Sequence, residues 1–338
     1  MKNLLLKLFI SLFIFNFSAS YSQYTEVINS NKPGFSESPY SVGKGIYQFE
    51  SNLFLRNTDT QPTFSRPQSF GFDMLFRTSF LLERLELNAQ VSYQKDQIAF
   101  KNIFTYQYST TGFGRATIGA KYLVFQQKYE DKSKEVRSWK KRYAFDKKRL
   151  IPSVAIYAGV NTDLVNDIYK TESISPKVGV LLQQNLSNDF NLITNFFYDY
   201  IGTEFAEYSY IVTGTFNFSN KWSTFFENQT VFQKNQSTTN LGIGLAYLFN
   251  QNLQINTSAR YLIEGKSQGI YSSLGISYRV NKHTDSYKDL NESEKELKET
   301  PISRYNANKK GFFGRIFNIF KKKKGRKSAR KKSKRKRN

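Results

Sequence analysis

The side chains that could do chemistry are few, and their positions disfavour catalysis. The chain has a single histidine, His283, and no cysteine, so thiolate catalysis, thiolate metal sites and disulfides are excluded. His283 follows the last alternating segment in a polar stretch, a setting typical of a surface residue rather than a general base. The sequence contains no phosphate-binding glycine loop or metal-ligand spacing. We therefore predict no enzymatic activity, no cofactor and no metal.

Charged residues recur at positions of one parity within segments that alternate between apolar and polar residues. In residues 85–94, Leu, Leu, Ala, Val and Tyr alternate with Glu, Asn, Gln, Ser and Gln. Strand side chains point to opposite faces at each step, so such a segment has one apolar and one polar face. The charged positions on the predicted polar, lumen-facing side are Glu50, Arg56, Asp73, Arg77, Glu86, Lys121, Lys177, Asp199, Glu227, Arg260, Glu264 and Arg279.

Two interpretations of these charges remain open. They form a ladder that steers solutes through a channel, or they form ion pairs that fill a narrow barrel and hold it rigid. Acidic and basic residues balance among them, which predicts no strong ion preference, since selectivity usually comes from rings of one sign.

The elements that must position these residues are twelve predicted strands. Most have the ~10 residues that a tilted strand needs to cross a bilayer. Aromatic residues make up 16% of the chain, and the mean hydropathy is −0.55, as expected when half of each strand is polar. The strands are expected at 45–56, 69–78, 84–95, 115–126, 151–162, 175–186, 190–201, 208–218, 222–233, 240–249, 253–264 and 270–280.

The predicted connections alternate in length. Tight turns are expected at 187–189, 219–221 and 250–252, and longer polar loops at 57–68, 96–114 and 163–174. The connection 127–149 is long and basic although it falls on the side of the short turns. Water-soluble β-sandwiches also alternate, and the sequence alone does not show whether the polar face is the interior.

The N-terminus predicts export. Residues 1–22 have the positive start, apolar stretch and small residues before Gln23 that are typical of a signal peptide. The apolar run is too short for a membrane helix, so a mature chain in the membrane must cross as a closed barrel. We predict an all-β, antiparallel transmembrane β-barrel of about twelve strands in the bacterial outer membrane. Its expected parts are the signal peptide, a lead-in or plug at 23–44, the barrel at 45–280, and a linker and tail at 281–338.

The C-terminal tail is strongly basic. It supplies much of the net charge of +23, and it is expected to be disordered or amphipathic. An apolar face precedes the run of Lys and Arg and predicts a membrane anchor of Phe312, Phe313, Ile316, Phe317 and Phe320. In the periplasm its partner would be anionic lipid, cell-wall polymer or an acidic protein, and export disfavours nucleic acid. The alternative is a solvated tail.

The segment before the first strand resembles a known family. Its motifs are Asn31-Lys32-Pro33-Gly34-Phe35-Ser36-Glu37-Ser38-Pro39, then Gly43 to Glu50, and later Gly114 to Tyr122, where Arg115 replaces the usual acidic residue. These motifs resemble those of an outer-membrane transporter family that is named for the meta-pathway of phenol degradation. The resemblance is to a Bacteroidetes-type outer-membrane β-barrel. The resemblance implies a barrel that moves apolar or aromatic solutes.

The same segment predicts a structure of its own. Gly34 and two prolines fix turns, so Pro33, Gly34, Phe35 and Glu37 are candidates for a plug folded into the lumen. An exposed periplasmic lead-in is the alternative. Taken together, the sequence predicts an outer-membrane channel for passive uptake of small solutes, of unknown identity, with outer-membrane lipid around it. A structural scaffold barrel whose tail docks a periplasmic partner is the alternative.

Overall fold

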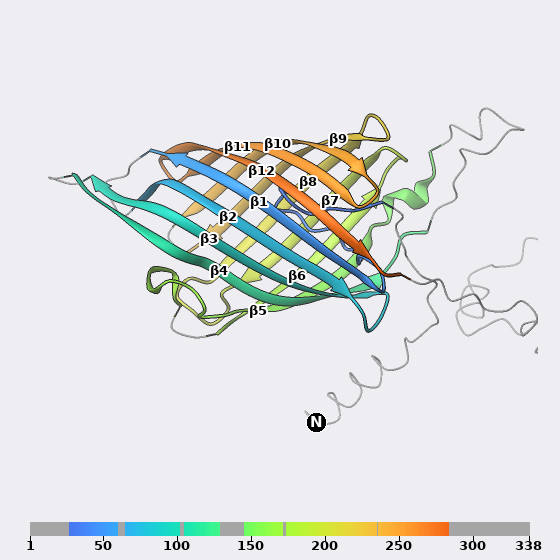
Figure 1. The fold of residues 1–338 in the computed structure, drawn as a ribbon, viewed down its shortest axis with the longest axis horizontal. Coiled ribbons are helices and arrows are strands. Elements are labelled where there is room, and N and C mark those ends of the chain that lie inside the picture. Colours follow the sequence, from blue (N-terminus) through green and yellow to red (C-terminus); the bar gives the residue numbers. More distant parts are fainter. Residues whose placement is uncertain are drawn as a thin grey trace, which may run out of the picture. The chain divides into compact units, whose positions relative to one another are not determined.

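The computed structural model describes residues 27–59, 65–101, 105–128, 145–171, 174–234 and 236–283. The predicted signal peptide and the tail candidates from Phe312 to Phe320 lie outside the described residues. Within them, twelve antiparallel strands form one closed barrel in which β1 pairs with β12 (Figure 1). Among the same residues, no helix is both long and apolar enough to cross a membrane.

The strands follow the predicted order, with ends that shift by a few residues in most cases. Their bounds are β1 Ile46–Thr58, β2 Ser65–Ser79, β3 Leu85–Lys101, β4 Thr105–Phe125, β5 Ser153–Asn161, β6 Ser175–Asn185, β7 Phe190–Asp199, β8 Glu207–Asn217, β9 Trp222–Gln233, β10 Ser237–Asn250, β11 Leu253–Glu264 and β12 Ser267–Asn281. Two short 3-10 helices, Lys147–Leu150 and Asp167–Tyr169, lie in the described connections.

The polar face of the sheet is the interior, which decides between a membrane barrel and a soluble sandwich. On β1, Gln48, Glu50 and Asn52 are buried, whereas Phe49 and Leu53 are 42% and 48% exposed. The strands β6, β11 and β12 show the same alternation of buried and exposed side chains, with a period of two residues. An apolar outer face is stable against hydrocarbon rather than water.

Aromatic side chains gather near both ends of the outer face. At the end where β1 begins and β12 ends, here called the terminal end, Trp222 lies 4.7 Å from Tyr247 between ring centroids. At the opposite end, here called the hairpin end, the rings of Tyr198 and Tyr208 stack at 4.3 Å. Amphipathic rings are favoured at the two membrane interfaces, so these pairs mark the bilayer boundaries.

One predicted loop is wrong. Residues 96–114 were expected to be a surface loop, but β3 extends to Lys101 and β4 begins at Thr105. The two strands form a hairpin that extends beyond its neighbours (Figure 1). A strand segment outside the bilayer needs no apolar face, so its polar composition resembles that of a loop. The expected contrast between short and long connections therefore does not hold.

Inward-facing rings are accommodated by glycines on the adjacent strands. In the described barrel, the rings of Phe54, Tyr157, Phe197 and Phe225 occupy space that a Cβ would fill at Gly71, Gly119, Gly179 and Gly244. A Cβ at these glycines would come within 2.4 Å of the ring or its hydroxyl. The rings therefore lie along the wall and leave the centre of the lumen to other residues.

This packing predicts the effect of a single methyl group. We expect Gly244→Ala to lower the free energy of unfolding by about 1–3 kcal/mol, because its Cβ would come 2.2 Å from Cε1 of Phe225 and 2.7 Å from the Thr257 carbonyl oxygen. Urea titration of the refolded barrel measures the change. The control is Gly214→Ala, where the nearest atom, on Phe190, is 3.4 Å away. Equal losses at both positions would contradict the role assigned to the Phe225 ring.

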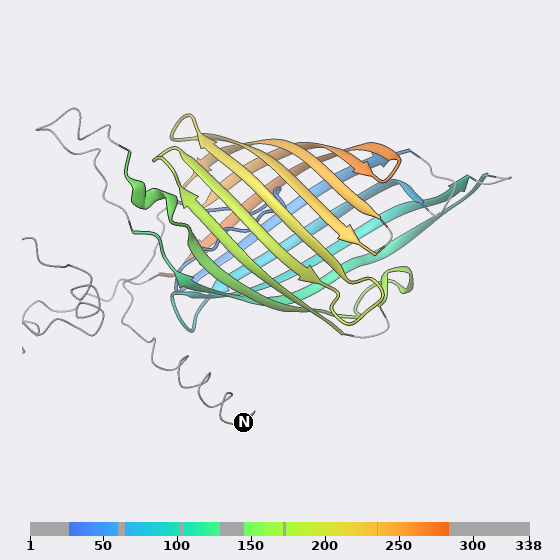
Figure 2. The same cartoon turned by 180° about the vertical axis from the view of Figure 1, so that it is seen from behind.

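The chain before β1 lies inside the barrel. Residues 27–44, here called the plug segment, run through the lumen near the terminal end and are visible from both sides (Figures 1 and 2). The segment includes buried side chains, among them Ile28, Ser38 and Val42. The backbone N–H of Ile28 donates to the Gln251 carbonyl in the β10–β11 turn at 3.0 Å.

Candidate functional site

The structure places the twelve predicted charged residues on the interior side of the wall. Arg56 and Asp73 are half-buried and line a cavity in the lumen, and Glu264 forms an ion pair with Arg56. The others are buried: Glu50, Arg77, Glu86, Lys121, Lys177, Asp199, Glu227, Arg260 and Arg279.

A buried ionic cluster forms on β1 to β4 near the terminal end. The Arg77 guanidinium lies 2.9 Å from both Glu50 and Glu86. The Lys121 ammonium lies 3.0 Å from Glu86. All four side chains are at most 1% exposed. Buried charges are tolerated only when they are paired and hydrogen-bonded, so the cluster constrains these four strands together.

Backbone N–H and carbonyl groups of the plug segment form further hydrogen bonds with the charged side chains of this cluster. Glu50 accepts from the N–H groups of Asn31 at 2.8 Å and Lys32 at 2.7 Å, and Glu86 accepts from that of Val42 at 2.9 Å. The cations bind carbonyl groups of the same segment: Arg77 donates to Asn29 at 2.9 Å and Lys121 to Ser38 at 2.8 Å. Backbone groups are obligatory donors and acceptors, so the wall charges substitute for water along the plug segment.

A second ionic pair, on β9 and β11, holds the middle of the plug segment. Glu227 accepts from the N–H groups of Phe35 at 3.0 Å and Ser36 at 3.1 Å, and lies 3.3 Å from Arg260. Arg260 donates to the Pro33 carbonyl, and its guanidinium lies 4.0 Å from the centre of the Phe35 ring. A charge-assisted bond is stronger than a neutral one, so this contact fixes the turn at 33–36.

Neutral side chains of the barrel wall also form hydrogen bonds with the plug segment. The Asn195 amide exchanges two hydrogen bonds with the Glu37 backbone, at 2.7 and 2.9 Å. The hydroxyl oxygens of Ser30 and Ser277 are 2.6 Å apart. Further bonds join Ser38 to Gln183, Tyr40 to Ser153 and the Lys32 carbonyl to Asn256.

The predicted plug candidates all lie in this region. Pro33 and Phe35 contact Arg260, and Glu37 contacts Asn195 through its backbone. Gly34 is packed closely, because a Cβ would meet the Asn31 carbonyl at 2.9 Å and Glu227 at 3.3 Å.

Two cavities lie on opposite sides of the plug segment. The hairpin-end cavity has a volume of about 560 Å³ and the terminal-end cavity about 790 Å³. Both are lined by the same four residues of the plug segment, Asn31, Lys32, Gly34 and Ser36. These residues therefore form the partition between the two halves of the lumen.

The hairpin-end cavity has an aromatic floor and a charged mouth. Phe54 stacks on Tyr271 at 5.5 Å, and Phe35 lies 6.0 Å from the same ring. At the mouth, Asp199 pairs with Arg115 at 3.7 Å and Lys177 at 3.6 Å. This arrangement can accept an apolar ring below a polar entrance.

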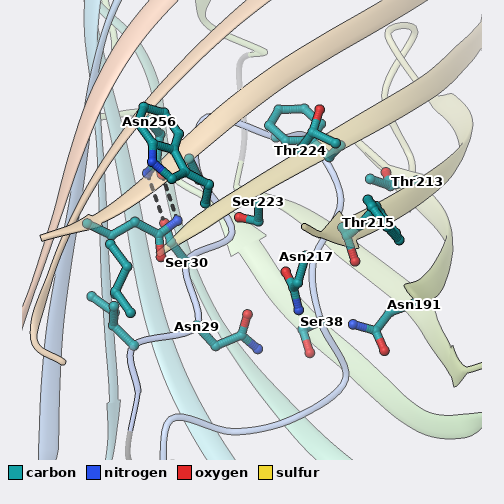
Figure 3. Close-up of a pocket in the computed structure, with 18 of the residues that line it drawn as sticks. Asn29, Ser30, Ser38, Asn191, Thr213, Thr215, Asn217, Ser223, Thr224 and Asn256 are labelled. Atoms are coloured by element: carbon teal, nitrogen blue, oxygen red, sulfur yellow. Dashed lines mark hydrogen bonds between the residues drawn. The ribbon is translucent and has the colours of Figure 1, made fainter. Parts of the chain in front are cut away.

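The terminal-end cavity is lined mainly by neutral amide and hydroxyl side chains. Figure 3 shows them converging from the plug segment and from β7, β8, β9 and β11. In the same view Asn256 lies beside Ser30, and its amide donates to the Ser30 hydroxyl at 3.5 Å. The Asn256 amide also donates to the Lys32 carbonyl at 2.9 Å. Charged lining residues are Lys32 and the turn residues Asp189 and Lys221.

Several lining residues were missed by the sequence reasoning. Arg66, Asp96 and Tyr169 form a contact network at the hairpin-end cavity, where the Tyr169 hydroxyl donates to Asp96 and the Arg66 guanidinium lies 4.6 Å from the Tyr169 ring centre. All three fell in stretches interpreted as loops. The neutral lining was missed because only charged residues were selected. Parity on β7 and β8 would have placed Asn191, Thr213 and Thr215 on the same polar face.

His283 lies away from both cavities. It is half-buried, and its Nδ1 lies 2.8 Å from the Lys44 carbonyl oxygen beside the end of β12. There it helps to join the end of the plug segment to the closing strand.

Comparison with known proteins supports the fold independently. A family profile described as "Putative MetA-pathway of phenol degradation" matches residues 30–280. No curated protein matches the sequence. The COG4313 outer membrane channel from Pseudomonas putida F1 is 10% identical, with a TM-score of 0.51, over 75% of this chain and 100% of that chain. This similarity shows the fold of an outer-membrane barrel.

Two other solved structures are similar with lower TM-scores. The CymD monoaromatic hydrocarbon channel is 9% identical, with a TM-score of 0.39, over 72% of this chain and 90% of that chain. The KdgM porin is 9% identical, with a TM-score of 0.42, over 68% of this chain and 98% of that chain.

Proposed function

The chain belongs to the family described as the putative MetA-pathway of phenol degradation, and from this premise we propose that it is an outer-membrane channel for passive uptake of small solutes. The observation that carries the proposal is the pair of cavities that enter the lumen from its two ends and meet at the four partition residues of the plug segment. A barrel built only as a scaffold has no need of an accessible space on each side.

We assign the plug segment the role of a gate. Its support is the set of contacts to wall charges, in which Glu50, Glu86 and Glu227 bind backbone N–H groups. Each bond is individually replaceable by water once the segment moves. Apolar or aromatic solutes are the class suggested by the family, and the rings of Phe35, Phe54 and Tyr271 support it.

The orientation follows from the same reasoning. Both ends of the barrel sequence, Ile46 and Asn281, lie together in the β1–β12 pair, and the ends of an outer-membrane barrel with an even number of strands face the periplasm. The terminal end then faces the periplasm, as would residues 284–338, whose expected partners are anionic lipid, cell-wall polymer or an acidic protein. A Bacteroidetes-type origin stays a prediction.

The alternative is a scaffold barrel whose tail docks a periplasmic partner. The observation that favours it is the buried ionic cluster around Arg77, which fills one side of the lumen with fixed charge pairs. The two readings differ in whether ions cross the barrel once the plug segment is removed.

Planar-bilayer conductance tests the proposal. We expect the refolded mature chain to show brief or small openings, and a variant lacking residues 27–41 to show stable openings several-fold larger, because the partition residues are gone. A version ending at Lys282 isolates the effect of the tail. Silence from the variant lacking 27–41, with heat-modifiable migration confirming a folded barrel, would reject the channel and favour the scaffold.

A further inference from the structure

The terminal-end cavity contains polar groups that the protein itself does not use. Asn191, Thr215, Asn217 and Ser223 line the cavity from β7, β8 and β9, and Asn29 faces them from the plug segment (Figure 3). Among the described residues, none of these five side chains has a hydrogen-bonding partner in the protein. Their donors and acceptors are therefore available to a molecule in the cavity.

The chemistry of this lining is uniform. Amide and hydroxyl groups both donate and accept hydrogen bonds and carry no charge. The charged lining residues are Lys32 on the plug segment and two exposed turn residues, Asp189 and Lys221. A ligand that presents neutral groups able to donate and accept on several sides fits this lining better than an ionised one, whose charge would be only partly compensated.

An aromatic ring completes the wall. Phe225 on β9 also lines the cavity, and its ring lies over Gly244 on β10. A ring held along a wall offers a flat face with a negative quadrupole, which suits the C–H groups on the apolar face of a sugar ring. Hydroxyl-binding groups and a stacking surface are thus combined in one chamber.

The size of the terminal-end cavity and its access to solvent suit weak binding of a small molecule. The volume of about 790 Å³ falls within the range of small-molecule sites, ~300–1,000 Å³. Two of the lining residues, Asn29 and Asn217, are exposed to solvent, so a bound molecule keeps contact with water. A channel requires binding that is strong enough for entry and weak enough for release.

We propose that the terminal-end cavity is a binding site for a neutral sugar of one or two rings, on the route through the barrel. The proposal rests on the proposed channel function, and it assigns a polar substrate class to the terminal-end cavity beside the apolar class that the rings of the hairpin-end cavity support. The sugar hydroxyls bond to the amide and hydroxyl groups of β7, β8 and β9, and one sugar face lies against Phe225.

Two matched double variants test the site. Thr215→Val with Ser223→Ala removes two hydroxyls from the terminal-end cavity, and Thr238→Val with Ser209→Ala removes the same two groups from the hairpin-end cavity. The probes are maltose and sodium glucuronate, titrated into the detergent-solubilised full mature chain and followed by ligand-observed NMR. We expect the maltose Kd to rise at least about fivefold in the first variant and to stay unchanged in the second.

The remaining outcomes overturn the proposal. Equal maltose binding in the wild type and the first variant would leave the cavity as a water-filled vestibule, and glucuronate bound as tightly as maltose would reject a neutral site. Potassium chloride conductance of the chain lacking residues 27–41 is measured in parallel. Conductance without maltose binding rejects the sugar site alone, whereas absence of conductance rejects the channel while the binding result still reports on the cavity.

Discussion

Oxidation of a Ser30→Cys/Ser277→Cys variant is expected to reduce solute flux by about tenfold or more, and reduction is expected to restore it. The hydroxyl oxygens of these serines are 2.6 Å apart, one on the plug segment and one on β12. This spacing brings two cysteine sulfurs within reach of an S–S bond of ~2.05 Å. The chain has no cysteine of its own, so no other thiol competes.

A matched pair on the wall provides the control. The hydroxyl oxygens of Ser258 and Ser273 are also 2.6 Å apart, but both residues belong to paired strands, β11 and β12. A disulfide at this control pair leaves the plug segment free, so flux through Ser258→Cys/Ser273→Cys should not depend on redox state. Liposome swelling measures both variants with and without reductant. Unchanged flux through the oxidised Ser30→Cys/Ser277→Cys variant would mean that solutes pass beside a stationary plug segment.

Replacement of Arg77 by methionine is expected to lower the free energy of unfolding by about 3–5 kcal/mol. The guanidinium holds Glu50 and Glu86 together, and all three side chains are at most 1% exposed. Without it, two buried carboxylates face each other with Lys121 as the remaining cation of the cluster. The loss also removes the bond to the Asn29 carbonyl, which loosens the start of the plug segment. Urea titration of the refolded barrel measures the effect.

Two further variants serve as controls for Arg77→Met. Lys170→Met removes a cation whose pair with Asp167 is largely exposed, and it should leave the free energy of unfolding nearly unchanged because solvent screens such pairs. Arg77→Lys keeps the charge but loses the forked geometry, so its loss should fall between the other two. A small loss for Arg77→Met, equal to that of Lys170→Met, would show that the cluster does not stabilise the barrel.

The two experiments separate the stability of the wall from the movement of the plug segment. The ionic cluster joins β1 to β4 and also binds the plug backbone, so one set of charges serves both purposes. The disulfide pair immobilises the plug segment without removing any charge.

How far the sequence predicts this site depends on the kind of residue. Parity alone assigned charged residues such as Glu50 and Glu227 to the polar face, because side chains alternate between the two faces of a strand with a period of two residues. Asn191 and Thr215 share that parity, but a neutral residue on a polar face carries no signal that separates a ligand contact from ordinary solvation. Arg66 and Asp96 were lost because a polar strand beyond the bilayer resembles a loop.

The sequence by itself determined the twelve-strand all-β architecture and which side chains share a face of each strand, since both follow from a local alternation between neighbouring residues. Only the tertiary structure decided that the polar face is the interior and which partners meet. Ser30 and Ser277 are 247 positions apart, and Phe35 reaches Glu227 across 192 positions. Contacts of that separation depend on closure of the barrel and on the path of the plug segment through it, and no local pattern encodes that path. The division of the lumen into a charged and a neutral chamber is a consequence of where the plug segment crosses.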